Sequence, residues 1–402
     1  SRRNPAAPLA ELMAALPPAS VAGKSPPWRV DHPLQPFDGA CFGDDPALRS
    51  FNPAFAAMVG GEPDATALLR PLPGRGVEAG ELSLKQVFDW CRDPARAVLA
   101  GGLGVRLDAL SERRLSGDEP LEAKLGVFDR QARALCEAAL EDPDFDFDAR
   151  PPEHLVLGGV LPPRPFGDAA WAAELELARG LVSVARGRSE VAALLEPTLA
   201  PLVVPAIARE VGGFRLAGEL ENVRGRDDSL FVTGLFPHID KESALGFRER
   251  LPLFLSWALC RLAPENAGRE VRVLALVGKA GKPQPTPWQD ALSAWDERFL
   301  GADAGKRAQM RAVLEGKLGF VLSVAARPAT SPWPYFPQTS WALAQDPEGE
   351  TPWPRERRYA PGYTRLLGRG IEPDEDADWK EALYLLADNL RRAMQPDEED
   401  PT

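Results

Sequence analysis

Gly213-Phe-Arg-Leu-Ala-Gly-Glu-Leu-Glu-Asn-Val223 and the later Ser229-Leu-Phe-Val-Thr-Gly234 are the two runs that decide the fold of this chain. In the first run, apolar side chains at 214, 216 and 220 alternate with polar ones at 215, 219 and 221, which is the period of a half-buried strand. The intervening Gly225-Arg-Asp-Asp228 has turn-forming composition, and Leu230 to Leu235 predicts a second strand. We therefore expect a β-hairpin whose apolar side chains are mostly buried: Phe214, Leu216, Leu220, Phe231 and Leu235.

Helices and one more strand follow the hairpin. A helical run extends from Glu242 to Ala263, and an apolar strand from Val271 to Val277. Helical spacing predicts further helices at about 287–300, 304–325 and 379–394, and an upstream helix at 121–140. A long helix with Asp168 as its N-cap is expected to bury a stripe of residues: Trp171, Leu175, Ala178, Val182 and Ala185. This order predicts an α/β fold, a small mixed sheet flanked by helices in a mainly helical surround with Pro/Gly-rich loops.

Composition and charge describe a globular protein that does not attract nucleic acid as a whole. The chain has 402 residues, which is long enough for two or three domains. It is 44% hydrophobic, as globular proteins are, and its net charge is −12. Any DNA contact therefore needs a local basic surface. Four cysteines without a C-x-x-C pair and three scattered histidines argue against zinc or disulfides, and predict reduced thiols, no cofactor and a cytoplasmic location. No apolar run reaches the ~18 residues of a membrane span, and a start without Met predicts a piece of a longer protein.

The first strand carries Gly218-Glu-Leu-Glu221, and the order of hairpin, helix and strand around it resembles the core of the RecB-type branch of the PD-(D/E)XK nucleases. In active members of that family the first strand carries Gly-x-x-Asp and the second Asp-x-Lys, and these residues bind Mg²⁺ for phosphodiester cleavage. The second strand here reads Leu230-Phe-Val-Thr233, without an acid or a lysine. The resemblance therefore implies a restriction-endonuclease-like core without catalytic residues or metal, with vestigial positions at Glu219 and Glu221.

Three further motifs occur in order along the chain: His32-Pro-Leu-Gln-Pro-Phe37, then Leu161-Pro-Pro with Phe166-Gly167, then Phe336-Pro-Gln-Thr-Ser-Trp341. Together they resemble the C-terminal part of the RecC family, the gamma subunits of exodeoxyribonuclease V. The signature residues are His32, Pro33, Leu34, Gln35, Pro36, Phe37, Phe336, Pro337 and Trp341. His32 has no visible acid–base partner in the sequence, so we expect a structural role for it.

The RecC resemblance implies both the domain organisation and the function. Residues 1–75 are expected to be the tail end of a helicase-like region with a connecting segment, 80–395 an inactive nuclease-like C-terminal domain, and 396–402 a disordered acidic tail. The implied protein is a non-catalytic, DNA-binding and scaffolding subunit of a heterotrimer with RecB-like and RecD-like subunits. It helps to split double-stranded DNA ends and to channel the unwound single strands for recombinational repair.

Residues 83–94 offer a second comparison with the RecB-type nucleases. Ser83-Leu-Lys-Gln86 is a capping box, which predicts the start of a helix that contains Cys91. Some of those nucleases place a Cys-Pro pair here and use the cysteine for an iron–sulfur cluster. The equivalent pair in this chain is Asp93-Pro94, so we expect no cluster.

The most basic segment, Trp353 to Arg369, supplies the candidates for nucleic-acid or partner contact. Arginines beside aromatic residues suit phosphate and single-strand contacts, and also protein interfaces. The candidates are Arg355, Arg357, Arg358, Tyr359, Tyr363, Arg365 and Arg369. Just upstream, the aromatic run from Trp333 to Trp341 fits either a base-stacking platform or the commoner packed corner.

Two other functions remain open at this point. One is a diverged but active Mg²⁺-dependent nuclease that uses Glu219, Glu221 and Asp240 with Lys241, although neighbours on a strand point to opposite faces. The other is an interaction module without a role on DNA, against which the arginine segment argues. DNA-binding and pull-down assays with RecB and RecD homologues distinguish the three.

Overall fold

The computed structural model divides the chain into two compact units, residues 1–64 and 65–402. The residues that it describes are 7–17, 26, 28–30, 32–33, 38–51, 56, 59, 81–99, 134–140, 142, 144–148, 150–158, 161–188, 204–225, 228–277, 286–326, 335–359, 362–363 and 377–396, with the backbone alone for 204–209, 358–359 and 377. In the first unit lie the α-helix α1 (Ala7–Ala15) and the short 3-10 helix η1 (Gly39–Phe42). The side chain of Asp38 caps η1 by accepting a hydrogen bond from the backbone N–H of Ala40.

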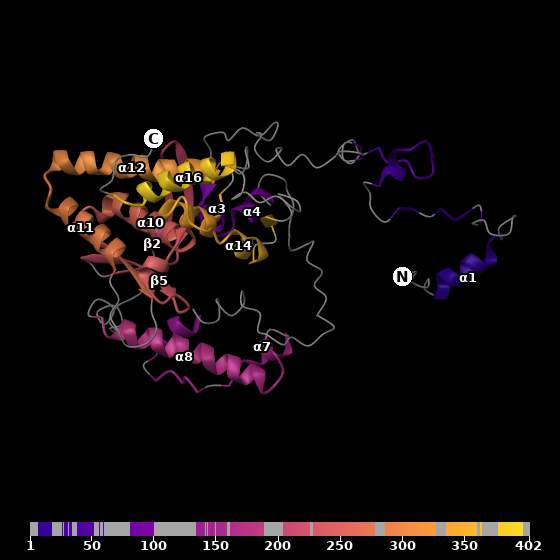
Figure 1. Ribbon diagram of the computed structural model, residues 1–402, viewed down its shortest axis with the longest axis horizontal. Coiled ribbons are helices and arrows are strands. Elements are labelled where there is room, and N and C mark those ends of the chain that lie inside the picture. Colours follow the sequence, from indigo (N-terminus) through magenta and orange to yellow (C-terminus); the bar gives the residue numbers. More distant parts are fainter. Residues whose placement is uncertain are drawn as a thin grey trace. The chain divides into compact units, whose positions relative to one another are not determined.

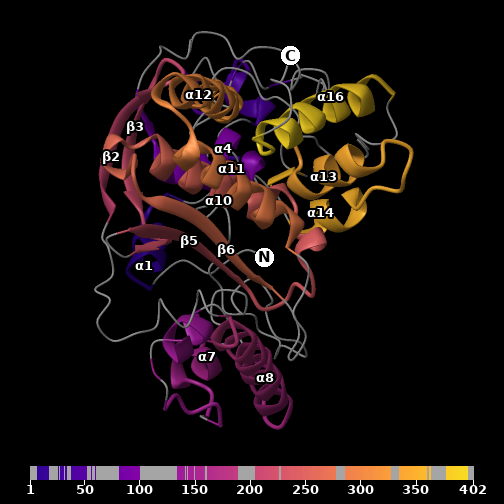
Figure 2. The same cartoon turned by 90° about the vertical axis from the view of Figure 1, so that its left-hand side faces the viewer.

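The second unit contains two three-stranded sheets (Figure 2). In the first, β3 (Phe214–Leu220) lies between β1 (Glu81–Ser83) and β2 (Val204–Val211), parallel to β1 and antiparallel to β2. Gly212 and Gly213 form the β2–β3 turn, where both backbones have the positive φ angles that favour glycine. The predicted strand is therefore present, but the prediction of its hairpin partner was wrong, because β3 pairs with the strand before it.

The second sheet has the order β4-β5-β6, with β4 (Val223–Gly225), β5 (Ser229–Phe236) and β6 (Glu270–Val277). β4 continues the chain of β3 after two residues and is antiparallel to β5, so the expected hairpin is only three residues long on this side. The carbonyl of Asn222, in the interruption, accepts hydrogen bonds from the backbone N–H (2.8 Å) and the hydroxyl (3.1 Å) of Thr233. β6 is parallel to β5, which requires the crossover through the following helix.

That crossover helix, α10 (Phe247–Leu262), is the centre of the main hydrophobic core. It follows two short segments: a turn after β5 and the 3-10 helix η4 (Glu242–Ala244); the 3-10 helix η5 (Pro264–Asn266) then leads to β6. The predicted helix began at Glu242, but the α-helix starts after Gly246, whose backbone N–H donates to the carboxylate of Glu249. α10 is buried almost throughout because β5 and β6 lie on one side and other helices on the other.

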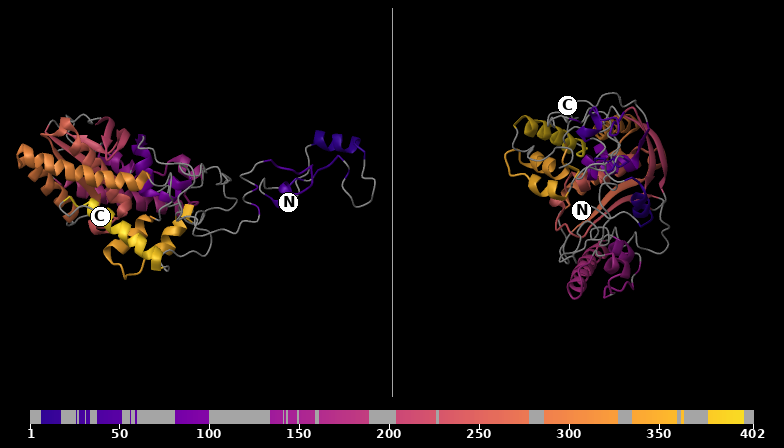
Figure 3. Two further views of the ribbon diagram at one scale, coloured as in Figure 1. Left: turned by 90° about the horizontal axis from the view of Figure 1, so that it is seen from above. Right: turned by 90° about the vertical axis from the view of Figure 1, so that its right-hand side faces the viewer.

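Three long helices enclose α10. They are α11 (Pro287–Gly301), α12 (Ala304–Ala326) and α16 (Ala377–Ala393), and all three confirm helices that the hydrophobic spacing predicts. α12 and α16 lie side by side (Figures 2 and 3), and the buried ammonium of Lys317 on α12 donates to the carbonyl of Gln395 just beyond α16 (2.6 Å). This bond satisfies a carbonyl at the helix C-terminus.

The segment before the sheets is helical as well. α3 (Leu84–Arg92) begins with the predicted capping box: the Ser83 hydroxyl accepts from the N–H of Gln86, whose side chain accepts from the N–H of Ser83. α4 (Pro94–Ala97) follows directly. Of the predicted helix at 121–140, residues 134–140 are described and are helical, while the rest lies outside the described residues.

α7 (Glu153–Leu157) and the long α8 (Phe166–Arg186) pack together through a small cluster that includes Leu155, Leu161 and Trp171. The predicted buried stripe of α8 is confirmed at all five positions. The predicted N-cap was wrong: the helix starts at Phe166, so Asp168 lies in its first turn, where a carboxylate still interacts favourably with the helix dipole.

The expected burial of the strand side chains is confirmed in part. Leu216, Leu220 and Phe231 are buried, whereas Phe214 and Leu235 are only partly buried. Phe214 opens β3 at the tight turn from β2, and Leu235 lies near the end of β5, so both are at the margins of their sheets. Their neighbours along the chain cover less of them than a central strand position does.

Candidate functional site

The two vestigial carboxylates lie at the end of β3. Glu219 is on the strand and Glu221 follows it, and both are exposed. The glycine that precedes them, Gly218, has a φ of +146° and lies against the start of α3, where an added Cβ would be 2.9 Å from the Cβ of Leu84. The backbone angle and the close approach explain why glycine is needed at this position.

The strand that would carry the acid and the lysine of an active nuclease is filled with apolar side chains. On β5, Leu230 and Val232 are fully buried in the main core, and Phe231 points into a second cluster against α8. Thr233 uses its hydroxyl to bind the carbonyl of Asn222. Both faces of this strand are therefore committed to packing, and no side chain on it is placed to hold a cation.

The Asp-Lys pair after β5 does not replace the missing residues. Asp240 and Lys241 are exposed in the segment before η4, whereas Glu242 is completely buried. The carboxylate of Glu242 accepts a hydrogen bond from the N–H of Gln289 (3.0 Å), in the first turn of α11. Burial raises the pKa of Glu242, and its bonds to the helix N-terminus lower it in part. Glu242 is therefore a structural cap.

The described residues do not bring metal-ligating side chains together. Across the parts of the chain that the structure describes, no group of three His, Cys, Asp or Glu side chains is arranged to hold a metal ion. Glu219 and Glu221 are two positions apart in the sequence, and β5 contributes no third carboxylate to a metal site.

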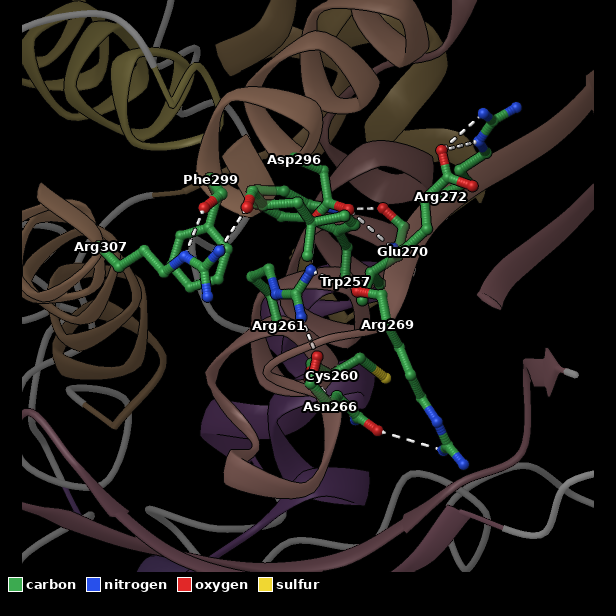
Figure 4. Close-up of polar contacts among 12 residues, drawn as sticks. Trp257, Cys260, Arg261, Asn266, Arg269, Glu270, Arg272, Asp296, Phe299 and Arg307 are labelled. Carbon is green, nitrogen blue, oxygen red and sulfur yellow. Dashed lines mark hydrogen bonds and ion pairs between the residues drawn. The ribbon is translucent and has the colours of Figure 1, made fainter. Parts of the chain in front are cut away.

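The most strongly bonded polar cluster lies inside the core, between α10, β6 and α11 (Figure 4). Arg261 and Asp296 form an ion pair of 2.7 Å with side chains 0% and 1% exposed. Asp296 also accepts from the backbone N–H of Val271 (2.8 Å), and Arg261 donates to the carbonyls of Asn266 and Arg269. Burial raises the pKa of Asp296, and the adjacent guanidinium offsets part of that rise.

This cluster covers the free edge of β6. The side chain of Gln289 bonds both the N–H and the carbonyl of Ala275, as a neighbouring strand would, while Asp296 bonds the N–H of Val271. α11 therefore satisfies the backbone of an edge strand with side chains. Perturbed ionisable groups can mark active sites, but with no exposed atom in the ion pair its role is structural.

The first seven residues of the arginine segment form a helix, α14 (Trp353–Tyr359), with one side buried and another exposed. Trp353 and Glu356 are buried, Arg355 is exposed and Arg357 is partly exposed. The carboxylate of Glu356 accepts from the N–H groups of Gln338 (3.0 Å) and Thr339 (2.8 Å), and so caps the N-terminus of α13 (Pro337–Gln345). Burial raises the pKa of Glu356 despite these bonds.

The aromatic residues of this region form a packed corner. Phe336, Trp353 and Tyr363 are all buried and lie against one another with ring centroids 4.5–5.7 Å apart. Tyr335 is buried too and stacks on Trp90 of α3. Of the two interpretations of the aromatic run, the described residues support the corner. Trp333 lies outside the described residues, as do Arg365 and Arg369, and for Arg358 and Tyr359 only the backbone is described.

A family model described as the RecC C-terminal domain matches residues 79–347, about two thirds of the chain. The chain belongs to the RecC family. No curated protein matches it. The matched range contains both sheets, the buried ion pair and α13, and it ends before α14. Membership of the RecC family suggests that the chain is a subunit of the RecBCD complex and that its partners are RecB, RecD and DNA.

Three of the signature residues of this RecC chain, Phe336, Pro337 and Trp341, lie in packed or helix-start positions. Phe336 is in the aromatic corner, and Pro337 opens α13 in the position that suits proline at a helix start. Trp341 packs edge-on against Phe247 (5.0 Å) and under the guanidinium of Arg250 (4.8 Å). His32 is exposed and Pro33 partly buried; Leu34, Gln35, Pro36 and Phe37 lie outside the described residues.

The position compared with an iron–sulfur ligand has a structural role in this RecC chain. Asp93 is the N-cap of α4, and its carboxylate accepts from the N–H of Arg96 (3.0 Å) with Pro94 at the first helical position. The neighbouring Cys91 is completely buried, which raises the pKa of its thiol far above the ordinary value. Burial also raises the pKa of Cys136 and of Cys260 to about 12.

Sequence reasoning missed the polar residues that act at a distance along the chain. Glu242, Glu356 and the pair Arg261–Asp296 are separated from their partners by between 17 and 47 positions, so no local pattern connects them. A charged residue inside an apolar helical run, such as Arg261, is the one available signal.

Among the described residues, no helix combines the length and the apolar composition that crossing a bilayer requires.

Proposed function

We propose that this RecC chain is a non-catalytic, DNA-binding and scaffolding subunit of a RecBCD-type helicase–nuclease. In this role it assembles in the cytoplasm with RecB-like and RecD-like subunits, and the complex processes double-strand DNA ends for recombinational repair. The chain helps to split the duplex and to channel the separated strands, while the nuclease and motor chemistry belongs to its partners.

The single observation that carries the absence of catalysis is the packing of β5. A metal-dependent nuclease of the resembled type needs an acid and a lysine on this strand, close to the carboxylate of the first. Here Leu230 and Val232 are fully buried and Phe231 is packed against α8. An ionised side chain at any of the three positions would lose its hydration without gaining a partner.

The arrangement around β5 also supports descent from a nuclease-like core. The short β4–β5 hairpin, the crossover helix α10 and the parallel strand β6 follow in the order of the resembled fold. Gly218 stands where the first motif of that family has its glycine and has a positive φ, while the acid three positions later is an exposed glutamate. On this proposal the packing survived after the chemistry was lost.

Incubation of the purified chain with linear DNA and Mg²⁺ or Mn²⁺ tests the catalytic part. We expect no cleavage, and identical results for wild type and for the Glu219→Ala, Glu221→Ala double variant. Cleavage that disappears in the double variant would instead establish the diverged nuclease. Contaminating nucleases are recognised because their activity persists in the double variant.

Co-purification tests the scaffolding part. The chain is expressed together with RecB and RecD homologues from the same source, and a tag on this chain should retain both. If neither homologue is retained, the scaffolding proposal fails, whatever the cleavage assay shows.

A further inference from the structure

Arginines from three separate elements, each exposed or partly exposed, lie near one another in the second unit. They are Arg96 on α4, Arg248 in the first turn of α10, and Arg355 and Arg357 on α14; we call these four residues the basic surface. The sequence suggested α14 alone, because the other two arginines are more than a hundred positions away from it or from each other.

Two carboxylates show that these elements meet. Asp93, the cap of α4, interacts electrostatically with both Arg96 and Arg248. Glu356 on α14 interacts with the same Arg248. In addition, Gly362, shortly after α14, lies so close to α4 that an added Cβ would be 3.1 Å from the Cβ of Ala95 and 3.5 Å from the backbone nitrogen of Arg96. Arg248 is therefore the central member of the basic surface, between α4 and α14.

The carboxylates beside these arginines are occupied by backbone donors. Asp93 accepts from the first turn of α4, and Glu356 is buried and accepts two N–H groups of α13. Each carboxylate is held in place by these bonds and offsets part of the charge of Arg248. On α14 itself, the one carboxylate set against Arg355 and Arg357 is Glu356, and it is buried. The outward side of α14 thus keeps an excess of positive charge on a chain whose net charge is −12.

The described aromatic residues next to the basic surface are too deeply buried to stack on bases. Trp353 and Tyr363 are 1% and 3% exposed and packed against Phe336, so neither ring can receive a base. Guanidinium groups recognise phosphate through charge and hydrogen bonds, without information about the bases.

We infer that the basic surface binds the phosphate backbone of a nucleic acid without sequence preference, with Arg248 at its centre. The inference rests on the proposed function and specifies its DNA contact. It moves that contact from the arginine segment to a surface built by α4, α10 and α14, and it assigns the aromatic residues of the segment to the core.

The test measures DNA affinity as a function of salt for the co-purified complex. The probe is a fluorescein-labelled blunt duplex, used in two unrelated sequences of equal length. The variant is the triple Arg96→Ala, Arg248→Ala, Arg355→Ala. Each lost phosphate contact removes about 0.9 from the slope of log affinity against log salt. A fourfold rise in salt should therefore weaken the DNA affinity of the wild type by a factor about forty times larger than the factor for the variant. The result should be the same for both duplexes.

A second triple variant controls for the change in net charge. Arg164, Arg215 and Arg298 are exposed and lie just before α8, on β3 and on α11, outside the basic surface. Replacing these three with Ala should leave the slope at the wild-type value. Equal effects of the two triples would overturn the inference, since only the total charge would then matter.

Two further outcomes would also overturn it. A loss that differs between the two duplexes would show recognition of bases. Intact DNA binding together with failed co-purification would show that the surface binds an acidic protein partner. If the wild-type chain fails to co-purify, the proposed function fails, and the same salt titration on the isolated full chain still tests the basic surface.

Discussion

Replacement of Asp296 by Ala removes one half of the buried ion pair and tests the account of the core. In the wild type, the Asp296 carboxylate bonds Arg261 at 2.7 Å and the N–H of Val271 at 2.8 Å. The side chains of Arg261 and Asp296 are 0% and 1% exposed. The variant leaves a guanidinium in the core with two carbonyls and the ring of Phe299 as partners but no counter-charge, and leaves a strand N–H without its acceptor.

The expected loss follows from these two defects. Breaking a buried ion pair by removing one partner costs about 3–5 kcal/mol, because the remaining charge is uncompensated. An unsatisfied buried N–H costs about 1–3 kcal/mol more, although the two terms are not independent. We therefore expect the free energy of unfolding to fall by at least ~3 kcal/mol, which is a large part of the stability of an ordinary domain.

Urea unfolding followed by tryptophan fluorescence measures this loss, since Trp257 and Trp295 lie in the same core. The matched control is Arg272→Ala, which breaks the neighbouring Glu270–Arg272 pair, whose side chains are 28% and 32% exposed. That pair should contribute less than ~1 kcal/mol. Equal losses for the two variants, or a loss below ~1 kcal/mol for Asp296→Ala, would refute the assignment of Asp296 as a structural ligand of Arg261.

Three other variants test the packing and the caps. Leu220→Ala should cost ~2–5 kcal/mol because Leu220 is buried, while Leu385→Ala on the exposed side of α16 should leave the urea midpoint almost unchanged. Gly218→Ala should destabilise more than Gly213→Ala, because both have positive φ but only the first meets α3; equal melting temperatures would contradict this. Burial raises the pKa of Glu356, so the folded chain keeps its proton to higher pH than the unfolded chain, and the contribution of this group to stability falls as pH rises above about 4.3. Glu356→Gln should therefore gain in melting temperature relative to wild type as the pH rises above that value, and a difference that stays constant with pH would show that burial does not raise the pKa of this carboxyl.

Local sequence determined most of the elements. The alternating run at 214–220, the apolar run at 271–277 and the helical spacing of 304–325 correspond to β3, β6 and α12, because each pattern reflects one face or two faces turned to a core. The capping box at Ser83 and Gln86 is equally local, since its two hydrogen bonds join residues three positions apart. The composition of β5 also indicated by itself that no acid or lysine stands where the resembled nucleases need them.

Tertiary structure decided which strands pair and which way the side chains of α14 point. β3 pairs with β2 because a glycine turn joins them, although the sequence after β3 also contains turn residues. In the arginine segment, spacing alone could not distinguish a solvent-facing aromatic from one in the core. Trp353 is buried because Phe336, from before the segment, and Tyr363, from further along it, close around it. Arg248 joins the basic surface for the same reason: electrostatic proximity depends on distance in space, and the chain brings α4, α10 and α14 together only when it folds.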